Sequence, residues 1–254
     1  MLTVVTQTTP GAVRANNEDS LLWDLDLGLI AVADGMGGHN AGEIASRMAL
    51  DVLQRFLKES SGDETQVWPF GYDPAASAPV NRLRTAVKLA NRDVLRTSEE
   101  RPECAGMGTT LTAALADGPN VLVANVGDSR LYAYMRSTGE FRQRTRDDSL
   151  VGMLADAPGV DLSALGGSPY KHLLTNVLGR RPDLNVSLEE ITIADGEVLL
   201  LCSDGMHGSV SDEAMQKVLD AEDDLKRAAD ILVNAALDGG SRDNISVLLA
   251  RYVV

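Results

Sequence analysis

The first part of the chain predicts three strands and then two helices. Three short segments rich in apolar and β-branched residues predict strands: Leu2–Thr8, Ser20–Leu25 and Leu29–Ala33. In Ala41–Lys58 the apolar residues recur instead at intervals of three and four, which is typical of a helix. The stretch Glu59–Pro79 is rich in Ser, Gly, Asp and Pro and predicts a loop, after which a second helix is expected at Val80–Thr97.

The second part predicts a strand meander followed by two more helices. Strands are expected at Thr109–Ala116, Val121–Val126, Ser129–Arg136 and Phe141–Arg144, with Gly- or Asp-containing turns between them. The stretch Thr145–Gly179 is irregular and contains several Gly and Pro residues. The last predicted elements are strands Val186–Thr192 and Glu197–Cys202, helices Ser211–Leu219 and Leu225–Leu237, and strand Ile245–Tyr252.

This order of elements indicates an α+β fold. Strands joined by short hairpins form antiparallel sheets, and each half of the chain supplies a pair of helices to cover them. The sequence has no repeat of fixed period, no low-complexity tail and no evident linker. Residues 1–254 are therefore expected to form a single domain.

Composition and charge narrow the classes of partner. The chain has 254 residues, of which 44% are hydrophobic, and its formal net charge is −14. An acidic chain lacks the basic surface that attracts nucleic acids and anionic membranes, so neither is expected as a partner. No apolar run approaches the roughly 20 residues that cross a bilayer, and the first residues do not resemble a signal peptide. With two cysteines, expected as free thiols, the chain fits a cytoplasmic location.

Carboxylates stand at the ends of several apolar runs. Asp34 follows Leu29–Ala33 and precedes Gly35, and Asp204-Gly205 ends a second run in the same way. Glycine lets the chain turn sharply and leaves its carbonyl free to coordinate a ligand. Asp243 precedes the last strand, and Asp128 lies between two strands of the meander.

These four carboxylates predict a site for a hard metal ion. Oxygen ligands without cysteine, and without a His-x-x-His spacing, select Mg²⁺ or Mn²⁺ over Zn²⁺. A lone Asp-Gly is a weak signal because the dipeptide is also common in turns. Asp117-Gly118 and Asp195-Gly196 are interpreted as such turns.

Taken together, the motifs resemble those of the metal-dependent protein phosphatases, the PPM or type 2C family, in its bacterial branch. The motifs that carry the resemblance are Arg14-x-x-x-Glu18-Asp19, Asp34-Gly35-Met36-Gly37-Gly38-His39, Gly108-Thr109-Thr110, Gly127-Asp128-Ser129-Arg130, Ser203-Asp204-Gly205 and Asp243-Asn244. They occur in family order from about Thr6 to Tyr252. The resemblance implies a four-layer αββα sandwich, with two central antiparallel sheets flanked by pairs of helices.

The resemblance also implies two Mn²⁺ or Mg²⁺ ions between the sheet edges. Asp34 is expected to bridge the two ions, and Gly35 to give its carbonyl to one of them. Asp204 and Asp243 are expected to complete the other. These assignments make Asp34, Asp204 and Asp243 both metal ligands and catalytic residues.

Four further roles follow from the same resemblance. Glu18 and Asp19 are expected to hold metal-bound waters in a second layer of contacts. Asp128, together with Asp204, matches the position that binds a third, weaker metal. Arg14 is expected as a catalytic residue that grips the phosphate, which suits the forked guanidinium. The alternative for Arg14 is a surface ion pair with Glu18.

The reaction implied is hydrolysis of phosphoserine and phosphothreonine in proteins. A water bridging the two metal ions is expected to attack phosphorus in line, without a covalent phosphoenzyme. The expected partners are phosphorylated proteins, among them bacterial Ser/Thr kinases and the substrates of those kinases. The chain itself is expected to act as a monomer.

Two features depart from the family pattern. Many animal members have a histidine, the proposed general acid, at the position that Met36 occupies here, and His39 is interpreted as structural. His207 is expected to pack or to face solvent. The segment Thr145–Gly179 matches the flap of bacterial members, but Asp148 stands where many of them have a histidine, so their substrate preference does not transfer.

Two other classes of function remain open on the sequence. The first is a pseudophosphatase that serves as a binding or scaffold module, although Asp34, Asp204 and Asp243 are all present. The second is a metal-dependent hydrolase of small phosphate esters. Turnover of phosphoproteins relative to nucleotides and sugar phosphates would distinguish it from a protein phosphatase.

Overall fold

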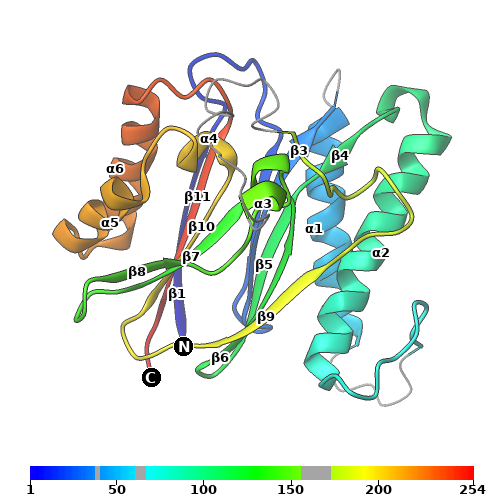
Figure 1. The fold of residues 1–254 in the computed structure, drawn as a ribbon, viewed down its shortest axis with the longest axis horizontal. Helices are drawn as coiled ribbons and strands as arrows, with labels where there is room; N and C mark the ends of the chain where they lie inside the picture. The colour runs from blue at the N-terminus through cyan, green and yellow to red at the C-terminus, as the bar shows by residue number, and fades with distance from the viewer. Residues whose placement is uncertain (38–40, 61–66, 156–172) are drawn as a thin grey trace.

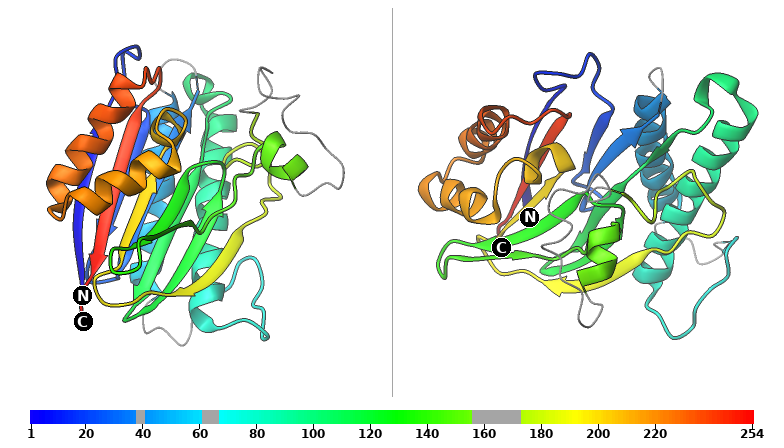
Figure 2. Two further views of the ribbon diagram at one scale, coloured as in Figure 1. Left: turned by 60° about the vertical axis from the view of Figure 1, so that its left-hand side comes forward. Right: turned by 45° about the horizontal axis from the view of Figure 1, so that its top comes forward.

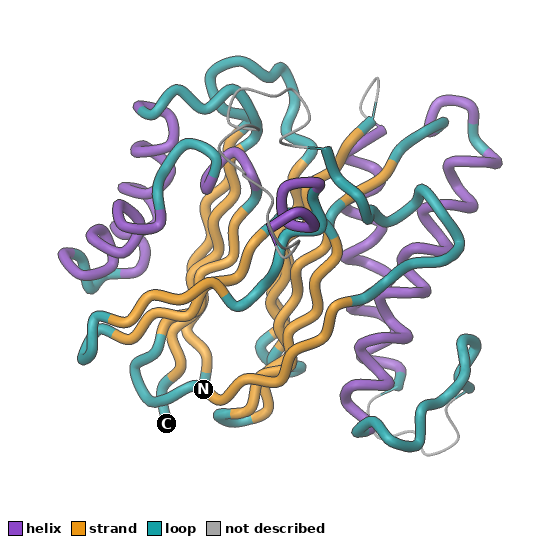
Figure 3. Tube along the Cα trace, in the orientation of Figure 1, coloured by secondary structure: helices purple, strands orange, loops and turns teal. Residues whose placement is uncertain are grey.

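The structure is a computed structural model that describes residues 1–37, 41–60, 67–155 and 173–254. Within these residues two antiparallel sheets stack face to face, and helices cover both outer faces (Figure 1, Figure 3). The predicted α+β fold and the four-layer αββα sandwich are confirmed.

The first sheet has five strands in the order β1-β11-β10-β7-β8. Their bounds are β1 Leu2–Thr9, β11 Ile245–Tyr252, β10 Val198–Cys202, β7 Arg130–Met135 and β8 Glu140–Gln143. The two ends of the chain therefore pair with each other, since Leu2 lies opposite Tyr252.

The second sheet has six strands, five of them in the order β2-β3-β5-β6-β9. Their bounds are β2 Asp19–Asp24, β3 Leu29–Met36, β5 Leu111–Asp117, β6 Asn120–Val126 and β9 Ser187–Thr192. The short strand β4, Gly108–Thr109, pairs with the end of β3 beyond the part that pairs with β5.

Each sheet is covered by its own pair of helices (Figure 2). The helices α1 (Ala41–Glu59) and α2 (Ala78–Glu100) pack on the second sheet, and α5 (Asp212–Ala221) and α6 (Leu225–Asp238) pack on the first. Helix α2 begins two residues before the prediction. The Ser77 hydroxyl accepts a hydrogen bond from the Val80 N–H, and a proline is tolerated in the first helical turn.

Three short elements were absent from the sequence prediction. They are the 3₁₀ turn η1 (Pro102–Cys104), helix α3 (Leu150–Ala155) and helix α4 (Asp204–His207). Each is too short to give a helical hydrophobic repeat. Helix α4 matters most, because Asp204 is its first residue rather than part of a plain turn.

The alternation of side chains along β3 explains where an otherwise apolar core strand places the Asp34 carboxylate. Leu29, Ala31 and Ala33 face the α1/α2 layer, whereas Ile30 and Val32 face the other sheet. Both faces are covered, so the strand is apolar throughout. Asp34 continues the Ile30–Val32 side, because residues two apart share a face of a strand. The carboxylate therefore emerges where the core between the sheets ends.

The same change from apolar to polar occurs on the neighbouring strands. We call these inward-facing positions the polar layer: Asp19, Asp34, Thr110, Thr112, Asn125, Ser129, Ser203 and Ser246. Apart from Asp34, all are buried. They hydrogen-bond across the layer; for example, the Thr110 and Ser129 hydroxyls lie 2.8 Å apart, and the Thr112 hydroxyl donates to the Ser129 carbonyl over 2.9 Å. The core between the sheets is thus apolar at one end and polar at the other.

Candidate active site

Asp34 lies within β3, which continues to Met36 rather than ending at Ala33 as predicted. Its backbone is held on one side by Thr110, whose hydroxyl accepts from the Asp34 N–H over 2.9 Å and whose own N–H donates to the Asp34 carbonyl over 2.9 Å. The Thr109 hydroxyl donates to the same carbonyl. These contacts fix the main chain, so the position of the carboxylate is set by the sheet.

Gly35 is required because two other chain segments approach its Cα. A Cβ atom added there would lie 2.1 Å from the Gly42 carbonyl oxygen at the start of α1 and 2.6 Å from the Glu18 carbonyl oxygen. The Gly35 N–H donates to that same Glu18 carbonyl over 3.1 Å. A side chain at this position would therefore push apart the segments that carry Glu18, Asp34 and helix α1.

Glu18 and Asp19 enter the site from the start of β2. Asp19 lies directly opposite Asp34 in the β2–β3 ladder, so the two side chains share a face. Its Oδ2 accepts from the Ser203 hydroxyl over 2.7 Å, whereas its Oδ1 has no hydrogen-bond partner among the described residues. The Glu18 carboxylate instead accepts from the Gly42 N–H at the N-terminus of α1.

Asp204 and Asp243 come from the other sheet. Asp204 follows β10 and begins α4, and Asp243 lies in the loop before β11. Asn244 ties that loop to the N-terminal segment: its amide group donates to the Pro10 and Asn16 carbonyls, and its Oδ1 accepts from the Glu18 N–H. One asparagine thereby places Asp243 beside the segment that bears Glu18.

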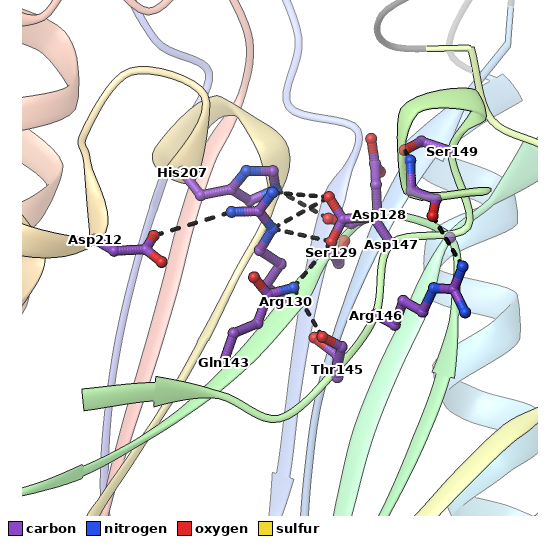
Figure 4. A network of polar contacts seen from close by, with 12 residues as sticks. Asp128, Ser129, Arg130, Gln143, Thr145, Arg146, Asp147, Ser149, His207 and Asp212 are labelled. Carbon is purple, nitrogen blue, oxygen red and sulfur yellow. Dashed lines mark hydrogen bonds and ion pairs between the residues drawn. The ribbon is translucent and has the colours of Figure 1, made fainter. Parts of the chain in front are cut away.

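Asp128 lies in the turn between β6 and β7 and is 7% exposed. His207, in α4, donates from Nε2 to the Asp128 carbonyl over 2.9 Å. The sequence interpretation, in which His207 packs or faces solvent, did not include this contact, which joins α4 to the turn. Figure 4 shows His207 beside Asp128, with Arg130 between Asp147 and Asp212.

The electrostatics show that these carboxylates share one region. Burial raises the pKa of Asp34 well above its usual value, and the charges of Asp19, Asp204, Asp128 and Asp243 raise it further. Burial also raises the pKa of Asp19 and that of Asp128, each to about 7, with Asp204 adding to both. Four aspartates from other segments therefore oppose the ionisation of Asp34, which is the situation that a bound cation relieves.

The donor set fits hard divalent cations. It consists of oxygen atoms alone, it carries excess negative charge, and it includes the unpartnered buried Oδ1 of Asp19. Among the described residues, no three acidic, histidine or cysteine side chains are drawn together as tightly as a coordination sphere requires. Like charges at close range repel, so we expect side-chain rotation of these carboxylates when cations bind.

Arg14 forms an ion pair, but with a different partner from the alternative considered above. Its Nη2 donates to the Asp243 Oδ2 over 2.6 Å, and Glu18 contributes only a weaker charge effect. The Arg14 side chain is 53% exposed. Exposed ion pairs stabilise a protein by about 1 kcal/mol or less, so little opposes transfer of this guanidinium to another anion.

The model of the family described as protein phosphatase 2C matches residues 12–238. The chain belongs to the protein phosphatase 2C family. The family and the enzyme class predicted from the sequence, a protein serine/threonine phosphatase, are thereby confirmed.

Named relatives of this phosphatase family are bacterial. The chain is 33% identical over 250 residues to the serine/threonine phosphatase Stp of Listeria monocytogenes, an alignment that covers 96% of this chain and 93% of Stp. It superimposes on the S. agalactiae serine/threonine phosphatase with a TM-score of 0.84 at 30% identity, covering 100% of both chains.

A third relative was solved with metal. The catalytic domain of the serine/threonine phosphatase PstP, in complex with two manganese ions, superimposes with a TM-score of 0.81 at 34% identity, covering 100% of this chain and 99% of that one. The ions of that relative agree with the cofactor predicted from the sequence.

The other sequence predictions concern His39, the flap, the two turn aspartates and Met36. His39 and the centre of the flap fall outside the described residues. Asp117 and Asp195 lie in turns at the opposite end of the sandwich, as interpreted from the sequence. Met36 is half-buried at the end of β3.

Sequence reasoning missed the residues that organise the carboxylates. Ser203, Thr110 and Asn244 were seen only as members of motifs, and His207 was set aside. A signal was available for the first two: each continues the inward side of an apolar strand, as Asp34 does. His207 and Asn244 act through contacts between distant segments, which no local pattern shows.

Proposed function

We propose that the protein hydrolyses phosphoserine and phosphothreonine in phosphorylated proteins, at the acidic end of the sandwich. The observation that carries the proposal is the convergence of four carboxylates on Asp34, each from a separate segment. A family fold alone would not require an active centre, and convergent acidic residues with raised pKa values are typical of one.

We assign the metal-holding roles as follows. Asp34 with the Gly35 carbonyl, and Asp204 with Asp243, would hold two Mn²⁺ or Mg²⁺ ions, and Asp128 would add a third position. When bound, two such ions would supply positive charge for the phosphoryl oxygens and would make a water nucleophilic near neutral pH. Such ions also offset the acidic charge that would otherwise repel a phosphate dianion.

The remaining residues act on waters and on the phosphate. Glu18 and Asp19 lie beside Asp34 and would accept hydrogen bonds from waters, orienting them. Asp19 is suited to this because one of its oxygens is already held by Ser203 and the other faces no protein donor among the described residues. Arg14 would bind phosphate oxygens through its fork, after leaving Asp243.

The cellular setting extends the proposal. No helix among the described residues has the length and apolar character to cross a bilayer. We propose that the protein works in the cytoplasm as a monomer, removing phosphate from Ser/Thr kinases and from proteins that such kinases modify. The similarity to bacterial serine/threonine phosphatases supports this setting.

A metal titration with matched substrates tests the function. Mn²⁺ should be added to chelator-treated protein with a phosphothreonine peptide, a nucleotide and a sugar phosphate as substrates. We expect Mn²⁺-dependent release of phosphate, with kcat/KM highest for the peptide. Metal binding without turnover of any substrate would favour a pseudophosphatase, and preference for a small ester would favour the hydrolase alternative.

A further inference from the structure

The base of the flap, residues 145–179, is fastened to the body of the protein by two adjacent aspartates. Asp147 forms a bidentate ion pair with Arg130 of β7, with N···O distances of 2.8 and 2.9 Å (Figure 4). Asp148 binds instead to Gly127, at the end of β6. The first limb of the flap, residues 145–155, is therefore attached to both sheets at once.

Asp148 makes four hydrogen bonds that link three segments. Its N–H donates to the Gly127 carbonyl over 2.8 Å, and its Oδ2 accepts from the Gly127 N–H over 3.1 Å. The same Oδ2 accepts from the Asn176 amide over 2.7 Å, and the Asp148 carbonyl accepts from the Thr175 N–H over 2.8 Å. One residue thus joins the first limb of the flap, the second limb and the turn before Asp128.

The two limbs also pair with each other and with the site. Ser149 lies opposite Leu174 in a β-bridge, and the Leu150 N–H donates to the Leu173 carbonyl over 2.9 Å. Further along, Leu178 exchanges two backbone hydrogen bonds with Thr109, at 3.0 and 3.1 Å. The second limb is therefore held to the strand that supports Asp34.

The turn that Asp148 holds packs closely against Thr110. Gly127 has φ +102°, and a Cβ there would lie 2.6 Å from the Thr110 Cγ2. Thr110 in turn accepts from the Asp34 N–H over 2.9 Å. Packing therefore runs from Asp148 through Gly127 and Thr110 to Asp34, and the next residue after Gly127 is Asp128.

We propose that Asp148 is a positioning residue that sets the flap relative to the candidate metal site. The proposal rests on the proposed function, because a protein substrate bound at the carboxylates would extend over the described limbs of the flap, residues 145–155 and 173–179, which Asp148 holds beside the Asp128 turn. A small ester bound at the carboxylates would not need to extend that far. Loss of the Asp148 side-chain hydrogen bonds should therefore weaken binding of a phosphoprotein more than it slows turnover of a small ester.

The test compares Asp148→Ala and Asp148→Asn with Asp183→Ala, which removes an exposed carboxylate beyond the flap. Hydrogen exchange is measured on chelator-treated protein, so that this readout does not depend on catalysis. We expect Asp148→Ala to speed exchange of the Gly127, Leu150 and Thr175 amides by about tenfold, the usual size of a lost hydrogen bond. Asp148→Asn keeps an acceptor oxygen and should stay within about threefold.

Kinetics give the second readout. We expect Asp148→Ala to raise KM for a phosphothreonine peptide by about tenfold, with kcat for p-nitrophenyl phosphate changed by less than about twofold. Exchange at Leu150 and Thr175 equal to that of Asp183→Ala, or equal losses on both substrates, would overturn the proposal. If the wild-type protein hydrolyses no phosphopeptide, the proposed function fails, while the exchange result still decides whether Asp148 fastens the flap.

Discussion

The two ends of the sandwich use the same dipeptide for different purposes. Asp34-Gly35 and Asp204-Gly205 lie at one end, among buried polar side chains and other carboxylates. Asp117-Gly118 lies at the other end, in the hairpin between β5 and β6, where a Cβ added to the glycine would meet no atom within 4 Å. The dipeptide itself makes no site.

What differs between the ends is the layer between the sheets. Toward the hairpin end this layer holds apolar side chains such as Val121 and Ile191. Toward the other end the same strand faces carry the polar layer. Buried hydroxyls there donate to carboxylates and backbone oxygens and accept from the Asp34 N–H, which fixes the acidic groups in place before any ligand arrives.

The largest effect is expected when one aspartate is neutralised at each end of the sandwich. Asp34→Asn should lower Mn²⁺-dependent kcat/KM for a phosphopeptide by at least about a thousandfold, because metal-ion charge stabilisation amounts to several kcal/mol. Asp117→Asn should leave it within about twofold. Unchanged turnover in Asp34→Asn would remove this residue from the metal site.

The second test substitutes a glycine at each end. Gly35→Ala forces a Cβ against the Gly42 and Glu18 carbonyls and should lower the free energy of unfolding by about 1–3 kcal/mol, or more. Gly118→Asn faces open space, and asparagine tolerates the left-handed backbone at φ +57°. Its free energy of unfolding should change by less than about 0.5 kcal/mol in urea titrations. Equal stability of the two variants would contradict the close approach at Gly35.

The third test concerns the Arg14 guanidinium, a positively charged side chain at the acidic end. Arg14→Ala should raise KM for phosphopeptide by about tenfold and leave the Kd for Mn²⁺ nearly unchanged, because the guanidinium binds phosphate rather than metal. Arg47→Ala, which removes an exposed ion pair with Glu43 on α1, is the matched control. Loss of metal affinity with KM unchanged would make Arg14 structural, acting through Asp243.

The smallest expected effect is a pH dependence of the protein's stability that arises from the acidic end. Burial raises the pKa of Asp19 to about 7, above its ordinary value of 3.8. Between these values the folded state binds more protons than the unfolded state, so its stability falls as pH rises from about 4 to about 7. In chelator, Tm should be higher at pH 5.5 than at pH 8 by about 5 °C.

Variants identify the groups that cause this fall of Tm with rising pH. Asp19→Asn should reduce the slope of Tm against pH without abolishing it, because the pKa values of Asp34 and Asp128 are raised as well. Asp117→Asn should leave the slope unchanged. Saturating Mn²⁺ should also reduce the slope, because bound cations favour the ionised carboxylates. An identical slope in Asp19→Asn and wild type would show that other groups cause the pH dependence.

Most of the strands and long helices followed from the sequence, because hydrophobic periodicity reports burial directly. The limits of helix α2 and strand β3 were misjudged where local rules compete with packing. The composition around Pro79 predicts a loop, although proline fits a first helical turn. The Asp34-Gly35 pair predicts the end of a strand, but the strand continues and pairs with β4. Helix α4 has no signal of its own at this length.

By itself the sequence determined the class of fold, the carboxylate residues and their oxygen-only chemistry, since these depend on periodicity and residue type. The tertiary structure decided how they meet: Asp19 opposite Asp34, Asn244 beside Glu18, His207 on the Asp128 carbonyl and Asp148 on Gly127. Each of these contacts joins segments that are distant in the chain. Such contacts arise from strand register and the stacking of two sheets, which no local stretch of residues encodes.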